Sequence, residues 1–290
     1  MNEQTRRKEM AVFQVSFMAE TLGRTVPIIV ILPTDKVYLP DMPRREEGKP
    51  YKTLYLLHGM IGDCTDWIYG TRIRRWAEER DLCVVMPSGD NMFYLDQENA
   101  GNCYSEFIGR ELVEFTRKTF PLSDKREDTY IGGLSMGGYG AIYNGLKYSD
   151  TFGAIVGLSS ALIVDDTLPI EAPDPEFPSD RTDFKKHVFG NDLEAVVRSE
   201  KNPKVLLSRL LDEKKEIPKL YLACGDDDFL RKKNDDFVEF LKENGVEYIY
   251  ETGPGDHEWD FWDTHIKNAL DWLPLEKAVQ GKSSGNIGKD

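Results

Sequence analysis

The 290-residue sequence has only four cysteines, and their spacing excludes two kinds of site. Cys64, Cys83, Cys103 and Cys224 form no CxxC pair, and none stands at zinc-finger spacing with a histidine. The chain also has no apolar run that approaches the ~18 residues of a membrane span. We therefore expect free thiols, no metal site and no membrane-spanning segment.

Positive charge is scarce relative to negative charge. Lys and Arg total 37 against 51 Asp and Glu, so the formal net charge is −14. Such acidity disfavours non-specific binding to nucleic acid and to anionic membranes. The chain also lacks a stripe of Lys and Arg interleaved with aromatic residues. We therefore expect neither nucleic acid nor a membrane as a partner.

The chain begins MNEQTRRKEM, which is charged and has no apolar h-region. A secretory signal needs such a region, so the sequence predicts a soluble, cytoplasmic protein. A signal peptide absent from this chain stays open as the alternative. Hydrophobic residues make up 40% of the sequence, which is ample for a sizeable core.

Short apolar runs alternate with helical patterns along most of the chain. The strand-like runs lie at 53–59, 81–87, 128–134, 152–160, 218–225 and 246–252, and helical patterns lie at 64–80, 104–120, 136–148, 231–245 and 257–273. This alternation predicts an α/β fold with a mostly parallel central sheet and helices on both faces. Two earlier runs, at 11–20 and 24–33, predict an antiparallel hairpin at one edge.

The alternation stops at residues 160–217. This stretch includes the proline-rich, acidic segment LPIEAPDPEFPSD, after which the strand pattern resumes. We therefore expect one domain over residues 10–275, with a small lid insertion at about 160–217. The polar tail at 276–290 is expected to be disordered.

The segment GLSMG at 133–137 matches the G-x-S-x-G pattern of a nucleophilic serine. It lies between a predicted strand and a predicted helix, which is the context that this pattern requires. A sharp turn from strand to helix exposes one side chain, and the helix N-terminus directs backbone N–H groups at the reacting atom. Ser135 is therefore the candidate nucleophile.

A serine hydroxyl needs a base, and the chain has four histidines. His257 follows the last predicted strand, where open α/β sheets place their sites, so it is the preferred base. His265, inside the last helix, is the alternative. The run CGDDDFL follows an earlier strand and offers Asp226, Asp227 and Asp228 as acids. The order serine, aspartate, histidine is that of α/β-hydrolases.

Acyl transfer places negative charge on a carbonyl oxygen, which backbone N–H groups stabilise. One donor is expected from Met136, directly after Ser135. The other is expected from the loop LLHGMIGD at 56–63, where Met60 follows HG. For His58 in this loop we prefer a structural role, in which its ring braces the loop by hydrogen bonds, to a catalytic one.

Together these motifs resemble the esterase D and tributyrin-esterase branch of the α/β-hydrolases, which includes acetyl-esterase-like and feruloyl-esterase-like members. The matching segments are LYLLHGMIGDCTDW, VVMPSGDNMFY, KREDTYIGGLSMGGYGA, ACGDDDFL with the following Asn234, and GDHEWDFW. They lie within residues 11–273, so the resemblance covers nearly the whole chain.

The resemblance implies residue roles and a reaction. Ser135 corresponds to the family nucleophile and His257 to its base. The family acid lies three positions after a glycine and before Phe-Leu, which selects Asp228. The position before the acid is often glutamate in the family and is Asp227 here, so Asp227 is the fallback. The implied activity is carboxylic ester hydrolysis with no metal or cofactor.

Large aromatic residues lie in or beside the motif loops. Trp67 and Trp259, with Tyr94 and Trp262, are expected to form an aromatic wall, unless they anchor the loops in the core. Such a wall favours acyl groups from acetyl to butyryl, on a small-molecule or carbohydrate-linked ester. The oligomeric state stays open, with a homo-oligomer as one option.

Two alternative enzymes share this fold. One is a feruloyl (cinnamoyl) esterase that acts on plant polysaccharide. The other is an S-formylglutathione hydrolase-type thioesterase, although such relatives more often have serine at the position of His58 and lack the HEW run. A hydrolase-like binding module without catalysis is a third alternative, which the presence of every triad residue disfavours.

Overall fold

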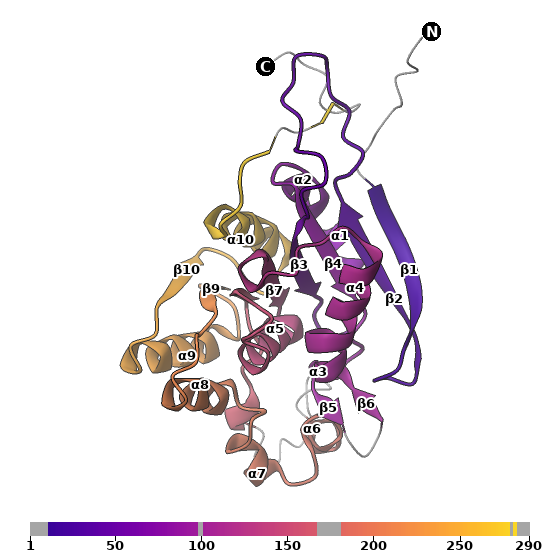
Figure 1. The fold of residues 1–290 in the computed structure, drawn as a ribbon. Coiled ribbons are helices and arrows are strands. Elements are labelled where there is room, and N and C mark those ends of the chain that lie inside the picture. The colour runs from indigo at the N-terminus through magenta and orange to yellow at the C-terminus, as the bar shows by residue number, and fades with distance from the viewer. Residues whose placement is uncertain (1–10, 98–100, 167–180, 279–280, 283–290) are drawn as a thin grey trace.

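The computed structural model describes residues 11–97, 101–166, 181–278 and 281–282. In these residues the central sheet has eight strands, in the order β1-β2-β4-β3-β7-β8-β9-β10 (Figure 1). The strands are β1 (Ala11–Ala19), β2 (Arg24–Leu32), β3 (Lys52–Leu57), β4 (Leu82–Pro87), β7 (Thr129–Leu134), β8 (Ala154–Leu158), β9 (Lys219–Gly225) and β10 (Tyr248–Gly253). The short strands β5 (Asp96–Gln97) and β6 (Asn102–Cys103) pair separately.

The sheet is parallel except at one edge. β1 pairs with β2, and β2 with β4, in antiparallel fashion, whereas every other neighbouring pair is parallel. This confirms the predicted antiparallel edge hairpin and the mostly parallel sheet. Parallel strands end at the same edge of a sheet, so the loops after β3, β7, β8, β9 and β10 meet there.

Helices cover both faces of the sheet, as predicted (Figure 1). The helices are α1 (Asp66–Gly70), α2 (Ile73–Glu78), α3 (Tyr104–Glu106), α4 (Leu112–Thr119), α5 (Met136–Lys147), α6 (Thr182–Phe189), α7 (Leu193–Val197), α8 (Pro203–Asp212), α9 (Arg231–Glu243) and α10 (Trp259–Trp272). Side chains of α1, α2 and α10 form one apolar core with the sheet. Those of α3, α4, α5, α8 and α9 form the other.

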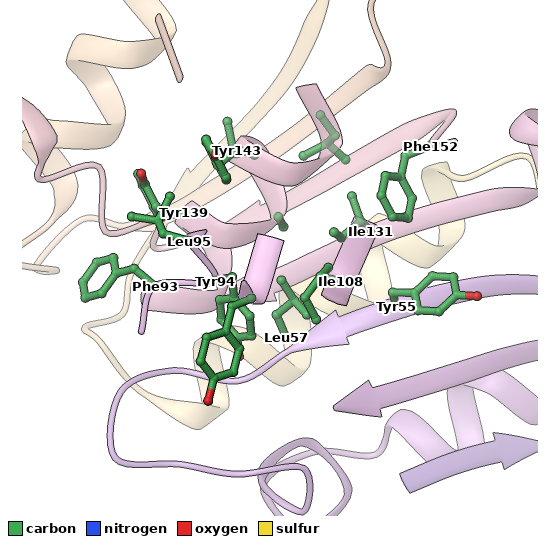
Figure 2. Close-up of a cluster of buried hydrophobic side chains, with 14 of the residues drawn as sticks. Tyr55, Leu57, Phe93, Tyr94, Leu95, Ile108, Ile131, Tyr139, Tyr143 and Phe152 are labelled. Atoms are coloured by element: carbon green, nitrogen blue, oxygen red, sulfur yellow. The ribbon is translucent and has the colours of Figure 1, made fainter. Parts of the chain in front are cut away.

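Helix α5 lies at the centre of the second core. Every residue from Met136 to Leu146 is buried, which explains why this helix is apolar and rich in small residues. Figure 2 shows Tyr139 and Tyr143 of this helix among the buried side chains of the cluster. Asn144 is also buried, and its amide donates to the Tyr94 carbonyl oxygen at 3.1 Å. The helix that follows Ser135 is thus held on all sides.

The segment 104–120 departs from the single amphipathic helix that its periodicity predicts. Helix α3 continues into a π-helical turn, Phe107–Glu111, before α4 begins. Phe120 lies beyond the helix in extended backbone. In the wider turn the Glu111 carboxylate accepts backbone hydrogen bonds from Glu20 at 2.6 Å and Thr21 at 3.1 Å. A tertiary contact with the β1–β2 turn therefore accompanies the change of helical period.

The insertion packs onto α5 through its described part. Tyr139 donates to the Lys201 carbonyl oxygen at 2.5 Å, between α7 and α8. The proline-rich segment predicted for this insertion falls on 167–180, outside the described residues. Part of the polar tail is described, and it contacts the domain: Ala278 N donates to Glu79 O at 2.7 Å, and Lys282 N donates to Val37 O at 2.9 Å.

Gly140→Ala should destabilise the protein. A Cβ at Gly140 would lie 2.4 Å from the buried Tyr94 ring, which has no space to move. This overpacking should outweigh the gain in helix propensity and lower the free energy of unfolding by about 1–3 kcal/mol. The matched control is Gly253→Ala, because a Cβ at Gly253 would meet nothing within 4 Å. Urea unfolding of both variants tests the expectation, and equal stabilities would contradict it.

Candidate active site

Ser135 occupies a strained turn between β7 and α5. Its backbone has φ 54° and ψ −120°, a combination that residues with a side chain rarely adopt. Hydrogen bonds to the end of β8 hold it: Ser135 N donates to Leu158 O, and Ala161 N donates to Ser135 O, both at 2.9 Å. The structure therefore has the strand–turn–helix geometry that G-x-S-x-G predicts.

Two glycines allow this turn to form against the neighbouring loop. A Cβ at Gly133 would lie 2.3 Å from the Gly137 carbonyl oxygen. A Cβ at Gly137 would lie 2.4 Å from Leu57 O and 2.5 Å from His58 O. Any side chain at either position would separate the turn from the loop after β3. This agrees with the requirement for glycine on both sides of the serine.

The two predicted oxyanion donors flank the serine. Met136 is the first residue of α5 and is fully buried, and the first N–H groups of a helix have no acceptor within it. Met60 follows Gly59, where a Cβ would lie 3.5 Å from that of Ser135. The loop that carries Met60 therefore lies directly beside the serine.

His58 braces this loop from inside the protein. The ring is buried, its Nε2 accepts from Gly89 N at 2.9 Å, and Nδ1 lies 2.6 Å from Gly59 O. Since a backbone N–H can only donate, Nδ1 must carry the ring proton and donate to Gly59. Burial lowers the pKa of His58, so this neutral form is stable. Both ring nitrogens are engaged, which supports the structural role predicted for His58.

Asp228 lies in the loop after β9 and contacts His257. Its side chain is fully buried, and its Oδ2 lies 2.9 Å from His257 Nδ1. Its Oδ1 accepts from Leu230 N at 2.8 Å. Burial raises the pKa of Asp228, but hydrogen bonds to the carboxylate, chiefly from His257, outweigh it, so the pKa lies below its usual value. The carboxylate is therefore ionised where it meets the histidine.

The other two aspartates of the run point elsewhere. Asp226 is exposed and pairs with Arg231 at 2.6 Å. Asp227 is also exposed, and its backbone N donates to Gly255 O at 3.1 Å. Asp228 thus forms the contact with His257, whereas Asp226 and Asp227 belong to the surface of the turn.

His257 lies in the loop between β10 and α10, with 19% of its side chain exposed. Two aromatic rings hold it: the Phe229 centroid lies 4.7 Å from that of His257, and the Trp262 centroid lies 4.9 Å away at 90°. The alternative base, His265, instead has its Nδ1 3.0 Å from Glu251 Oε2. The structure thus pairs His257, not His265, with the aspartate run.

The aromatic residues predicted to line the substrate divide into two groups. Trp67 is only 1% exposed, and its indole N–H donates to Leu57 O at 2.9 Å. Trp67 therefore anchors the loop, which corrects its predicted place in a substrate wall. Trp259 is partly exposed and meets Trp67 edge-on, with ring centroids 5.8 Å apart. It remains the candidate for such a wall.

Sequence reasoning missed two residues of this region. Phe229, beside His257, is 66% exposed and presents an apolar face next to the predicted base. Ser159, after β8, is buried, and its Oγ accepts a hydrogen bond from Trp262 Nε1 at 3.1 Å. The sequence signal for Ser159 was only a serine pair at the end of a predicted strand. That signal does not show which of the two hydroxyls bonds another part of the chain.

Within the described residues, no group of three or more His, Cys, Asp or Glu side chains is arranged to hold a metal ion. Of the helices described, none combines the length and apolar character that crossing a membrane requires.

Comparison with known proteins gives concordant relatives. The Esterase family model matches residues 19–273. An acetyl esterase of Caldicellulosiruptor saccharolyticus is 44% identical over 266 residues, which cover 91% of this chain and 98% of that protein. A solved structure of fluorophosphonate-binding serine hydrolase F from Staphylococcus aureus is 35% identical, with a TM-score of 0.78 over 91% of this chain and 98% of that one.

A second solved structure, S-formylglutathione hydrolase from Staphylococcus aureus, is 36% identical, with a TM-score of 0.77 over 91% of this chain and 99% of that one. The family match spans most of the chain, and the two solved structures share its fold and are 35% and 36% identical to it over the aligned residues. The chain therefore belongs to the Esterase family, within the α/β-hydrolase superfamily, and is a carboxylic ester hydrolase.

Proposed function

We propose that this esterase hydrolyses short-chain acyl esters, from acetyl to butyryl, through a Ser135–His257–Asp228 triad. The observation that carries the proposal is the 2.9 Å hydrogen bond between Asp228 and His257. It lies at the sheet edge where Ser135 follows the last residue of β7. A buried, ionised carboxylate that holds one nitrogen of a partly exposed imidazole is what a general base requires.

The contacts imply a sequence of steps. Because Asp228 accepts the Nδ1 proton, the lone pair on Nε2 of His257 is free to take the proton of the Ser135 hydroxyl. The serine oxygen attacks the ester carbonyl, and the N–H groups of Met60 and Met136 stabilise the oxyanion. The intermediate collapses to an acyl-enzyme as His257 gives its proton to the leaving alcohol. Water, activated by the same histidine, then releases the acid and restores the serine.

The proposed acyl range rests on the aromatic surroundings and on a relative. Phe229 and Trp262 contact His257, and Trp259 lies edge-on to Trp262 with centroids 5.2 Å apart. Rigid rings at this distance from the base leave room for small acyl groups rather than long chains. The relative at 44% identity carries the name acetyl esterase.

A second candidate is a thioesterase that acts on S-formylglutathione. The observation that favours it is the 36% identical structure of that name. A thioester and an acetyl ester both need the same nucleophile and oxyanion donors, so the site itself does not separate them. Turnover of S-formylglutathione, compared with p-nitrophenyl acetate and methyl ferulate, separates the thioesterase, the acetyl esterase and the feruloyl esterase.

Ser135→Ala should abolish esterase activity. Loss of the nucleophile lowers kcat by about 10⁴-fold or more in hydrolases of this type. A fluorophosphonate should label the wild-type protein on Ser135 alone, as mass spectrometry of the adduct can test. Unchanged thermal unfolding of the variant serves as the control for folding. Labelling at another residue, or full activity in the variant, would contradict the proposed mechanism.

Asp228→Asn should lower kcat far more than Asp226→Asn. The amide keeps the shape of the carboxylate but cannot hold the Nδ1 proton of His257, and such changes cost about 10⁴-fold in kcat. Asp226 is the matched control, since it lies two residues away and pairs with Arg231 at the surface. Steady-state kinetics with p-nitrophenyl acetate test this. Similar losses in both variants would remove Asp228 from the proposed role.

The acyl-chain preference should decline steeply beyond butyrate. We expect kcat/KM for p-nitrophenyl esters to be highest between acetate and butyrate and to fall by hexanoate, because rigid rings bound the space. Trp259→Ala should flatten this profile by opening the wall. Decanoate turnover equal to that of acetate in the wild-type protein would refute the short-chain proposal without affecting the triad.

A further inference from the structure

Asn234 is a buried polar residue that the proposed mechanism does not use. It lies near the start of α9 and is 1% exposed. Its Oδ1 accepts from Ser160 N at 3.1 Å, and its Nδ2 donates to Ser160 O at 3.1 Å and to Leu230 O at 2.9 Å. A backbone N–H can only donate and a carbonyl oxygen can only accept, so these partners fix the orientation of the amide. Asn234 thus joins two separate loops through their backbones.

The Ser160 end of this contact belongs to the chain just after β8, which supports the nucleophile. On one side of Ser160, Leu158 O accepts from Ser135 N, and on the other Ala161 N donates to Ser135 O, both at 2.9 Å. Helix α5 packs closely here as well, since a Cβ at Gly138 would lie 3.0 Å from the Ser160 Cα. The strained backbone of Ser135 persists only where its surroundings hold it. A shift of Ser160 would therefore reach the nucleophile.

The Leu230 end of the contact belongs to the loop of the acid. Leu230 N donates to Asp228 Oδ1 at 2.8 Å, and Arg231 N donates to Asp228 O at 2.8 Å. Leu230 O accepts both from the side chain of Asn234 and from its backbone N, the latter at 3.1 Å. The residue that receives the Asn234 amide is thus the residue that donates to the buried carboxylate.

This contact lies just past the point where the sheet stops joining the two chains. The last registered pair of β8 and β9 is Leu158 with Ala223. Beyond it, the chain after β8 turns to support Ser135, and the chain after β9 leads to Asp228. The backbone ladder of the sheet no longer fixes their separation there, whereas the Asn234 amide connects them.

We propose that Asn234 is a positioning residue for the triad. Its amide joins Ser160, which supports the nucleophile, to Leu230, which holds the acid, and so sets the distance between the serine and the acid–base pair. The inference rests on the proposed function of this site. An amide suits this role because it offers one acceptor and two donors, which match one N–H and two carbonyl groups. A misplacement of about 1 Å between reacting groups can cost ~10²-fold in rate.

A second buried asparagine provides a matched control. Asn202 is 6% exposed, its Oδ1 accepts from Lys204 N at 3.1 Å, and its Nδ2 donates to Val197 O at 2.9 Å. It therefore also joins backbone groups, but in the insertion and away from the triad loops. Asn234→Ala and Asn202→Ala remove the same atoms from buried positions. The variants are compared by kcat and KM for p-nitrophenyl acetate and by the rate of fluorophosphonate labelling, at a temperature where thermal unfolding shows each to be folded.

For Asn234→Ala we expect kcat to fall by about 10- to 100-fold with KM nearly unchanged, because the nucleophile and the base are misplaced while the substrate surface stays. Labelling should slow by a similar factor, since it uses the same serine and histidine. Asn202→Ala should unfold at a lower temperature than the wild-type protein but match it in kcat and in labelling. Asn234→Gln keeps the amide but sets it one methylene further from α9, so it should also lower kcat with KM nearly unchanged.

A double variant separates positioning from a general loss of stability. Residues that act as a unit in catalysis are strongly non-additive. Adding Asn234→Ala to Asp228→Asn should therefore cost little further activity, because the acid that Asn234 positions is already lost. A residue that serves only the fold would lower kcat by the same factor in both backgrounds.

Wild-type kcat and labelling in a folded Asn234→Ala, equal losses in Asn202→Ala, or additive losses in the double variant would each overturn the positioning role. If Asn234→Ala does not fold, Asn234→Gln decides the question, and wild-type kcat in that variant would overturn the role as well. If instead Ser135→Ala keeps its activity, the proposed triad itself fails.

Discussion

The buried carboxylate of Asp228 is the constraint on which this site depends. A carboxylate removed from water is costly unless donors surround it, and here a histidine and a backbone N–H do so. The histidine comes from the loop after β10, and the N–H belongs to the chain just beyond β9. Satisfying one charge therefore joins the loop after β9 to the loop after β10.

The second constraint is the close approach of two backbones at the serine. The turn at Ser135 contacts the loop after β3 through glycines that leave no space for a side chain. Its strained conformation is stabilised by hydrogen bonds to the end of β8. Helix α5, buried along nearly its whole length, cannot shift to relieve the strain. Tyr94 and Leu57 are among the buried side chains near this helix (Figure 2). The packing of the core around α5 thus fixes the position of Ser135.

Local patterns predicted most of the architecture because they are short-range. Apolar runs bounded by glycine and charge located the strands, and the first two, joined by LGR, indicated the edge hairpin. The 104–120 segment shows where such reasoning ends. Its apolar spacing suits one regular helix, yet the Glu111 carboxylate bonds the β1–β2 turn and the helix contains a π-helical turn. Trp67 shows the same limit, since its position in the sequence does not distinguish a residue that lines the substrate from one that anchors a loop in the core.

Neighbours along the chain are enough to predict the alternating α/β pattern, the strand–turn–helix context of Ser135 and the order serine, aspartate, histidine. The folded structure was needed to show which of three adjacent aspartates meets His257, that both nitrogens of His58 are engaged, and that Trp67 anchors its loop. Those outcomes depend on burial and on contacts between residues far apart in sequence. The three aspartates are alike in sequence, but Asp228 is buried whereas Asp226 and Asp227 are exposed, and only the fold shows this difference.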